Sequence, residues 1–457
     1  MTRLLLIRTA AVGAFALLSG CNTLRTPYVR PDATIQTQWA NASGAGQAAS
    51  DRWWKRFGDS QLDQLVDRVL ARDNDLAVAA ITLQRARLQA RFAVINPKLS
   101  ASGSYNDNIP LKGGRANSQS QSASVMASYE VDLFGALAAQ KDAARWEARA
   151  TAEDLESTRL SLIGTTVDDH FQIGFLNERI ALATQSVTYA RKTLDLVKVQ
   201  ADAGAASSLE VAEAAQSVES QEASLEDLTR QRVEARSALN LLLNGETAAE
   251  ADELQALPQG DPPPVDAGLP ATLLARRPDL RAAEMRLRWK LAQLDQSRLS
   301  FYPTLSLTGQ VGSSSTTLSQ LLQNPAGALG ADLALPFLQY DQLKLNVGIS
   351  RTDYDTATVQ FRQTLYQALA DVENALSAVS RYGAEGVALE ASLKNARTVE
   401  RLDEVRYRAG AIPLKTWLDA QESRRQAEAS MAQNRLNRLQ SYVTLCKALG
   451  GDPALGG

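Results

Sequence analysis

Four segments of this chain alternate apolar and polar residues with a period of two, the spacing of a β-strand with one apolar and one polar face. Their apolar positions carry mostly Leu, Val, Ala and Tyr, and their polar positions carry mostly Ser, Thr, Gln, Glu and Asp. Each segment has about the 10 residues that a tilted strand needs to cross a bilayer. The segments are residues 99–106, 122–133, 304–311 and 328–337. The pattern is typical of a membrane barrel with a wet lumen, although a strand of a soluble sandwich alternates in the same way.

The connections between these strands favour the membrane interpretation. Residues 107–121 and 313–327 are rich in Gly, Ser and Asn, as expected of long exposed outer loops, and the other strand ends run directly into predicted helices. A membrane barrel needs about 8 strands and tolerates no open edge in lipid. Four strands per chain therefore require partner chains. Two copies would close a small barrel with a packed lumen, and three copies would close a twelve-stranded barrel with room for a channel.

Two long stretches without proline predict helices that are longer than an ordinary domain. No proline occurs between Pro110 and Pro258 or between Pro336 and Pro413. In each stretch we expect a helix on the order of 100 Å long, then a turn at Gly204 or Gly410, then a returning helix. The predicted long helices are residues 136–202, 207–243, 339–408 and 413–449, and shorter helices are predicted at 60–95 and 272–300.

A coiled-coil stripe marks part of the first long helix. Apolar residues there step by three and four without interruption, which predicts a left-handed supercoil. They are Ile173, Leu176, Ile180, Ala183, Val187, Ala190, Leu194, Val197 and Ala201. The second long helix holds the same phase at Leu389, Leu393 and Ala396, but then places Glu400 and Asp403 on it. Either the stripe shifts to Val399 and Leu402 as a stutter, or this face of the helix meets water.

The chain is internally duplicated. Asp75-Leu76 corresponds to Asp279-Leu280 at an offset of 204 residues, and Pro97 corresponds to Pro303 at an offset of 206. The turn Ala203-Gly204-Ala205 corresponds to Ala409-Gly410-Ala411, again at 206. A nearly constant offset of this kind indicates a repeat. We divide the chain into a leader (1–20), an extended segment (21–58), a first repeat (59–245), a Pro-rich connection (246–271), a second repeat (272–451) and a tail (452–457).

Composition excludes several classes of function. The net charge is −3 with both signs interspersed, whereas a nucleic-acid surface would show a basic patch. The chain has two cysteines, Cys21 and Cys446, and one histidine, His170. Neither a disulfide framework nor a multi-histidine metal site is expected, and Cys446 is interpreted as packing. We find no phosphate loop, zinc spacing or nucleophile elbow, so no catalytic site, cofactor or metal is predicted.

Other polar and aromatic groups are interpreted as structural. Asp168-Asp169-His170 could suggest acid–base chemistry, but we interpret these residues as polar positions on an exposed helix. Trp39, Trp53, Trp54 and Phe57 lie in the irregular N-terminal segment. We expect these aromatic residues to pack against helices.

The N-terminus has the pattern of an exported lipoprotein. Arg3 and Arg8 precede an apolar stretch, residues 9–18, that is too short to span a bilayer, and Leu18-Ser19-Gly20-Cys21 follows. A chance cysteine after an ordinary signal peptide is the alternative. The pattern resembles a bacterial lipoprotein signal, which implies cleavage before Cys21 and lipid on that residue. Asn22, rather than Asp, at the next position implies delivery to the outer membrane.

Further local motifs strengthen a family resemblance. They are Trp53-Trp54-Lys55-Arg56-Phe57-Gly58-Asp59, Tyr129-Glu130-Val131-Asp132-Leu133-Phe134-Gly135, Arg276-Arg277-Pro278-Asp279-Leu280, Phe301-Tyr302-Pro303 and Tyr407-Arg408-Ala409-Gly410 with Leu418-Asp419-Ala420-Gln421. With the duplicated layout, these residues resemble the TolC-like outer-membrane factors, and more closely the OprM/NodT-type lipoproteins of resistance-nodulation-division efflux pumps. The resemblance spans essentially the whole mature chain.

The resemblance implies a fold and an assembly. The fold class is mainly α with a membrane β part: a homotrimer whose twelve strands form one outer-membrane barrel, continuous with a long periplasmic helical barrel. Its implied partners are a periplasmic adaptor protein and an inner-membrane pump, which open the closed periplasmic end. The implied location is the outer membrane of a Gram-negative bacterium, with a lipid anchor at Cys21. No nucleic acid is implied.

The resemblance also implies which residues close the periplasmic aperture. They lie around the second turn and are Tyr407, Arg408, Ile412, Leu414, Lys415, Thr416 and Asp419. Related proteins often carry an acidic ring one helical turn before Asp419, but this chain has Lys415-Thr416 there, which leaves Asp419 as the acidic candidate. A ring of Asp419 could set pore selectivity, unless Arg406, Arg408 or Lys415 pairs with it. An ordinary exposed helix-end pair is the alternative.

The two repeats differ at this end of the hairpins. The first carries Ser207, Ser208, Glu210 and Glu213, which we interpret as adaptor-facing or solvated, and Gly204 and Gly410 are interpreted as turn glycines. The difference suggests that the second hairpin moves while the first stays as a frame.

Passive efflux of small molecules is the preferred function. A duct for secreted polypeptides and a structural coiled-coil lipoprotein are the alternatives, and the substrates cannot be read from the chain.

Overall fold

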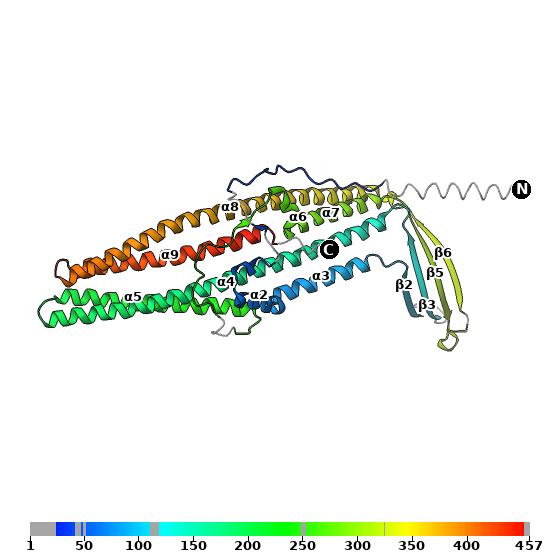
Figure 1. The fold of residues 1–457 in the computed structure, drawn as a ribbon. Coiled ribbons are helices and arrows are strands. Elements are labelled where there is room, and N and C mark those ends of the chain that lie inside the picture. Colours follow the sequence, from blue (N-terminus) through cyan, green and yellow to red (C-terminus); the bar gives the residue numbers. More distant parts are fainter. Residues whose placement is uncertain are drawn as a thin grey trace. The chain divides into compact units, whose positions relative to one another are not determined.

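The computed structural model describes residues 24–41, 47–48, 52–109, 118–247, 253–323 and 325–451, and Figure 1 shows its ribbon. The chain forms two compact units. Of the residues that the structure describes, the first comprises those within 24–33, 82–152 and 282–363, and the second comprises those within 34–81, 153–281 and 364–451. Among the described residues, none of the helices combines the length and the apolar character that a membrane span requires.

The same order of elements occurs twice along the chain. Short helices precede two strands, and the strands lead into two long helices. The first set is α2 (Ser60–Arg72), α3 (Asn74–Phe92), β2 (Lys98–Asn108), β3 (Ser118–Val131), α4 (Ala136–Asp202) and α5 (Ser208–Leu242). The second set is α6 (Leu273–Arg276), α7 (Pro278–Leu299), β5 (Thr304–Ser315), β6 (Ala326–Ala334), α8 (Tyr340–Arg408) and α9 (Leu414–Ala448). Outside the repeats, β1 (Gln47–Ala48) pairs in parallel with β4 (Val265–Asp266).

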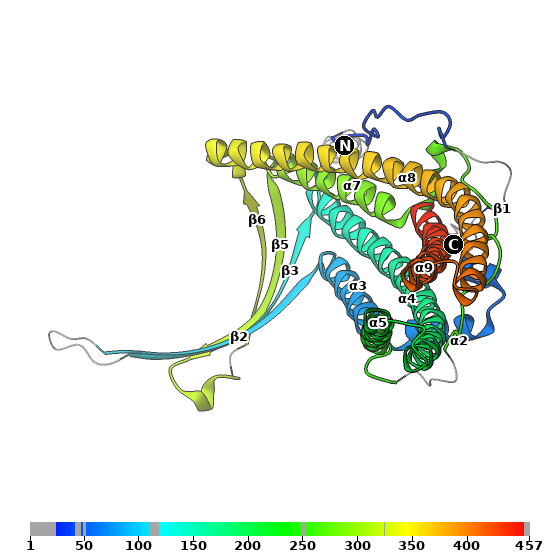
Figure 2. The ribbon, with the colours of Figure 1, turned by 90° about the vertical axis from the view of Figure 1, so that its left-hand side faces the viewer.

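The four long strands form one antiparallel sheet in the order β2-β3-β5-β6, which is curved (Figure 2). The pairing keeps each face uniform, because Val125 lies opposite both Ala101 and Val311. On the other face the Ser104 and Ser122 hydroxyls lie 2.8 Å apart. The predicted alternation is therefore confirmed. Within the described part of the chain, β2 and β6 each have only one neighbour, so both edges of the sheet are open.

Several predicted boundaries of the strands are wrong. β6 ends at Ala334 rather than at Phe337, because Pro336 begins a short 3-10 helix, Pro336–Gln339. Proline has no N–H for a ladder bond, so the strand stops before it. The strands also extend into the predicted outer loops: β2 continues to Asn108 and β5 to Ser315.

Both shorter helices are broken, where single helices were predicted. The first stops at Asp73, whose carboxylate accepts a hydrogen bond of 2.9 Å from the Leu76 N–H and so starts α3 as a separate helix. The second breaks at Arg277, which is extended (φ −74°, ψ 122°) because Pro278 follows it. The long helices, in contrast, match the predicted bounds within one residue.

α4 with α5, and α8 with α9, form two long hairpins (Figure 1), which we call the first and second hairpins. The predicted stripe of the first hairpin is confirmed, since all nine of its residues are buried or half-buried. In the second hairpin both alternatives are wrong. Val399 and Leu402 are about half exposed, while Asp403 is buried and Glu400 is half-buried. The stripe keeps its phase and continues to Tyr407.

Equivalent ion pairs confirm the duplication in three dimensions. Arg191 of α4 binds Glu222 of α5 at 2.6 Å, and Arg397 of α8 binds Glu428 of α9 at 3.1 Å. Each member of the second pair lies 206 residues after its counterpart. The two hairpins therefore share the same helix-to-helix register.

The main apolar core of the second unit surrounds the N-terminal aromatic residues. Trp53 and Trp54 are fully buried, and the Phe57 ring meets the Phe171 ring edge-on at 4.9 Å. Trp39 is also buried, and its indole N–H donates to the Gly268 carbonyl at 2.9 Å. The expectation that these residues pack is confirmed, and Cys446 lies buried in the same core.

The prediction of an exposed His170 is wrong. Its ring is buried, and its Nε2 lies 2.8 Å from the Asp59 carboxylate. Asp59 also accepts hydrogen bonds from the N–H groups of Gln61 and Leu62 and so caps α2. These bonds, above all the one from His170, lower the pKa of Asp59. The start of α2 covers this part of α4, which periodicity within α4 alone could not reveal.

Candidate functional site

The turns that end the two hairpins have the same backbone geometry. Gly204 (φ 75°) and Gly410 (φ 70°) adopt the left-handed conformation that favours glycine. The N–H of Gly204 donates to the Ala201 carbonyl at 2.9 Å, and the N–H of Gly410 donates to the Tyr407 carbonyl at 2.8 Å. Both glycines therefore end long helices, as predicted.

An aromatic cluster joins the ends of the two hairpins. Tyr407 of α8 stacks on Trp417 of α9, with ring centroids 5.2 Å apart and an interplanar angle of 24°. Val197 of α4 and Ala214 of α5 belong to the same buried cluster, which also contains Leu414. We call these five residues the tip cluster. It unites all four long helices, so a separation of the hairpins here would expose apolar surface.

A single hydrogen bond from the tip cluster reaches a polar group of the first hairpin. The Tyr407 hydroxyl donates to Gln200 Oε1 at 2.7 Å. Burial raises the pKa of Tyr407, and the Glu210 carboxylate raises it further, so the hydroxyl keeps its proton as a donor. Because phenol and amide are both neutral, this contact carries no net charge.

The charged candidates at the second turn are each paired on their own helix. Lys415 binds Asp419 at 3.0 Å, and Arg408 binds Glu404 at 2.7 Å. The side chains of Lys415 and Asp419 are about two-thirds exposed, so this pair contributes little to stability. Of the three cations considered for Asp419, the structure pairs it with Lys415. Its negative charge is therefore partly balanced within each chain.

The remaining candidates divide by exposure. Ile412 is half-buried and packs against the tip cluster, whereas Thr416 is exposed. In the first hairpin, Ser207 and Glu210 form a capping box at the start of α5. This box gives both residues a local role in the helix start. Ser208 is exposed, and Glu213 is half-buried.

Sequence reasoning missed Gln200 and Trp417. One signal was available for their surroundings: continuing the stripe from Glu400 and Asp403 by four residues reaches Tyr407 and places it on the inner seam. No local pattern identifies Gln200 as the acceptor, because it lies 207 residues earlier in the chain. The predicted lipidation site, Cys21, lies outside the described residues.

Comparisons with known proteins agree with this architecture. The family model described as outer membrane efflux protein matches residues 65–245 and 269–451. The pyoverdine export outer membrane protein OpmQ of Pseudomonas putida is 30% identical over 446 residues, which cover 95% of each chain. The toxin and drug export protein A of Aggregatibacter actinomycetemcomitans is 28% identical and is matched over 97% of both chains.

A solved structure shows the same fold. The outer-membrane channel OprN superposes with a TM-score of 0.83 at 25% sequence identity. The match covers 94% of this chain and 99% of that one. Both units, with their sheet and hairpins, thus have counterparts in a known channel protein.

Proposed function

This chain belongs to the outer membrane efflux protein family, and we propose that three copies of it form a passive exit duct through the outer membrane. In this proposal the sheets join into one twelve-stranded barrel and the hairpins form a periplasmic tunnel. The observation that carries it is the four-stranded sheet with two open edges, because a sheet in lipid must close on itself. No covalent chemistry is involved, since the duct only conducts.

The apolar surface beside the sheet edges supports the trimer. α3 precedes the open edge strand β2 and exposes Leu88 (54%) and Phe92 (75%). α8 follows the other edge strand, β6, and exposes Leu345 (68%) and Ile349 (61%). If β6 pairs with β2 of the next copy, it brings α8 against that copy's α3. One pairing then covers both apolar stripes.

We place the resting closure of the duct at the second turn, at Tyr407, Arg408, Ile412, Leu414, Lys415, Thr416 and Asp419. The stacked Tyr407 and Trp417 and the bond to Gln200 support a latch between the hairpins. The likeness to an outer membrane export protein further supports an adaptor and an inner-membrane pump as the partners that release it. Lipid on Cys21 completes the proposed attachment to the membrane.

Small molecules are the proposed cargo. The name of the OpmQ relative refers to export of pyoverdine, and the other relative's name refers to both toxin and drug. Because the name of the second relative includes a toxin, secretion of polypeptides is the second candidate function. A susceptibility and secretion assay on a deletion strain, complemented with this chain, separates them: restored drug resistance without restored toxin export supports small-molecule efflux.

Reconstitution in planar bilayers, with chemical crosslinking of the same sample, tests the duct itself. We expect trimers that conduct weakly at rest. A monomer without conductance would overturn the proposal. Adding the Tyr407→Phe substitution tests the gate separately, because it leaves the barrel strands unchanged.

A further inference from the structure

The inner seams of the two hairpins differ in chemistry at matched positions. In the first hairpin Leu194 and Val197 of α4 and Val218 and Leu228 of α5 lie on the seam and are buried or half-buried. The residues 206 positions later are Glu400, Asp403, Arg424 and Asn434. They keep the same inward positions, since Asp403 and Asn434 are buried and the others half-buried. We call these four residues the polar seam.

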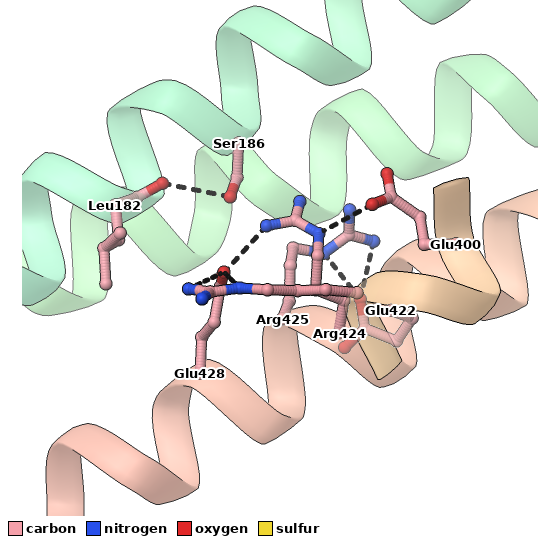
Figure 3. A network of polar contacts seen from close by, with 8 residues as sticks. Leu182, Ser186, Glu400, Glu422, Arg424, Arg425 and Glu428 are labelled. Atoms are coloured by element: carbon pink, nitrogen blue, oxygen red, sulfur yellow. Dashed lines mark hydrogen bonds and ion pairs between the residues drawn. The ribbon is translucent and has the colours of Figure 1, made fainter. Parts of the chain in front are cut away.

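An arginine between two glutamates holds the middle of the polar seam (Figure 3). Arg424 lies 3.2 Å from Glu400 of α8 and 2.8 Å from Glu428 on its own helix. Glu428 also binds Arg397 of α8, and this is the pair that the first hairpin keeps as Arg191–Glu222. The added members in the second hairpin are therefore Glu400 and Arg424. Their side chains are 13% and 19% exposed, so water screens them little.

Apolar contact is also reduced further along the same seam. In the first hairpin Ile180 and Leu228 belong to one apolar cluster. Their counterparts are Gly386 and Asn434, and a Cβ on Gly386 would come within 2.9 Å of the Asn434 amide oxygen. Asn434 instead donates to the Tyr382 carbonyl at 3.1 Å and to Glu385 at 3.2 Å. A pair of large apolar side chains is replaced by a glycine and an amide.

These replacements lower the stability of the packing between α8 and α9, the two helices of the second hairpin. Ion pairs taken out of water regain little free energy beyond the cost of desolvation, and apolar residues of similar size often stabilise such positions better. Polar residues on a coiled-coil seam fix the register of the helices but lower their stability. The second hairpin therefore keeps its alignment with a smaller resistance to local separation.

We propose that the polar seam makes the second hairpin compliant along its length, so that its internal packing, and not the tip cluster alone, sets how readily the duct opens. The proposal rests on the proposed function, in which the hairpin ends close the duct. It assigns a conformational role to Glu400, Asp403, Arg424 and Asn434.

Grafting the first hairpin's seam onto the second tests the proposal. The variant carries Glu400→Leu, Asp403→Val, Arg424→Val and Asn434→Leu, which leaves Arg397 paired with Glu428. Hydrogen exchange is measured on the full-length protein in nanodiscs. In the wild type we expect faster exchange at residues 386–434 than at 180–228. The graft should slow exchange at 386–434 by about tenfold and lower the frequency of opening in bilayers.

Arg424→Met alone is the opposite control, because it leaves Glu400 on the seam without its partner. It should speed exchange at 386–434 and raise the opening frequency. Equal exchange in the two wild-type hairpins, or a graft that changes neither exchange nor opening, would overturn the proposal. If the wild-type protein does not conduct at all, the proposed function as a duct fails instead. The difference in hydrogen exchange between residues 386–434 and 180–228 then still measures the effect of the polar seam.

Discussion

The hydroxyl of Tyr407 donates a hydrogen bond of 2.7 Å to Gln200, which links the last turn of α8 to the last turn of α4. The same tyrosine stacks on Trp417 at the start of α9. One residue of the second hairpin thus makes both a polar contact with the first hairpin and an apolar contact within its own. A motion that opens the hairpin ends must break the polar contact, whereas the stack can move with its hairpin.

Tyr407→Phe should therefore favour the open state without unfolding the tip. The substitution removes the hydrogen bond but keeps the stacked ring. A hydrogen bond of this kind contributes about 1 kcal/mol, which corresponds to about a fivefold shift in the ratio of open to closed channels. Single-channel recording measures the shift. Gln200→Ala should produce a similar shift, and Tyr366→Phe, an exposed tyrosine of α8, should produce none. Unchanged opening in both tip variants would show that this bond does not hold the duct closed.

Because Lys415 and Asp419 form an ion pair, we predict that substituting each of them shifts the ion selectivity of the channel in opposite directions. Asp419→Ala releases the Lys415 charge, and Lys415→Ala releases the Asp419 charge. Charged rings near a pore axis set ion selectivity. We expect the reversal potential in a salt gradient to shift toward anions in the first variant and toward cations in the second. Reversal potentials that stay at the wild-type value in both variants would place this pair away from the conduction path.

Much of the fold could be predicted because its signals are local and repeated. Period-two alternation located the strands, and the turn glycines Gly204 and Gly410 located the hairpin ends. The failures have physical causes of the same local kind. Asp73 ends one helix by capping the next, and Pro278 forces Arg277 out of the helical conformation. Both residues are visible in the sequence, but the apolar periodicity continues across them. Single helices were therefore predicted.

The candidate site was predictable only in part. Tyr407 was identified from the motif before the second turn. Its partner Gln200 lies 207 residues away, so that bond depends on packing between the two hairpins. Its stacking on Trp417 depends on how the turn brings α9 beside α8. The inward position of Glu400 was misread because a charged residue on an apolar stripe suggests water or a stutter. Arg424, on the returning helix α9, pairs with Glu400 and makes that position acceptable. The pairing depends on the register of α9 against α8, which the apolar pattern of α8 alone does not contain.

The apolar stripes beside the sheet edges predict a specific loss of assembly. Leu345→Asp with Ile349→Asp places two carboxylates on the face of α8 that should meet α3 of the next copy. Burying them there without partners costs several kcal/mol, so the trimer should dissociate. Native mass spectrometry in detergent reports the stoichiometry. Leu269→Asp, at an exposed residue outside the long helices, is the matched control and should leave trimers intact. Trimers that persist in the double variant would contradict the proposed pairing of β6 with β2.

The acidic pair beside His170 predicts a stability that falls as pH rises. Burial is the main cause that raises the pKa of Asp168 to about 7 and that of Asp169 to about 6. At Asp168, Lys447 lowers the pKa and the Asp169 carboxylate raises it, and the value of about 7 includes both effects. A carboxyl with a raised pKa binds its proton more tightly in the folded protein. Its contribution is complete below the unfolded pKa of 3.8 and is lost as pH rises through about 6 to 7.

Asp168→Asn removes the larger of these two shifts. The amide stays neutral, so the variant should be more stable than the wild type at pH 8, on the order of 1 kcal/mol after allowing for screening. Near pH 4, where the wild-type carboxyl is protonated in the folded state, the two proteins should unfold at similar temperatures. Thermal unfolding from pH 4 to pH 8 measures the difference. Asp154→Asn, on the same helix, provides the control. A wild-type stability that rises between pH 5 and pH 7, together with an Asp168→Asn variant that follows the same curve, would show that Asp168 is ionised and compensated in the folded protein.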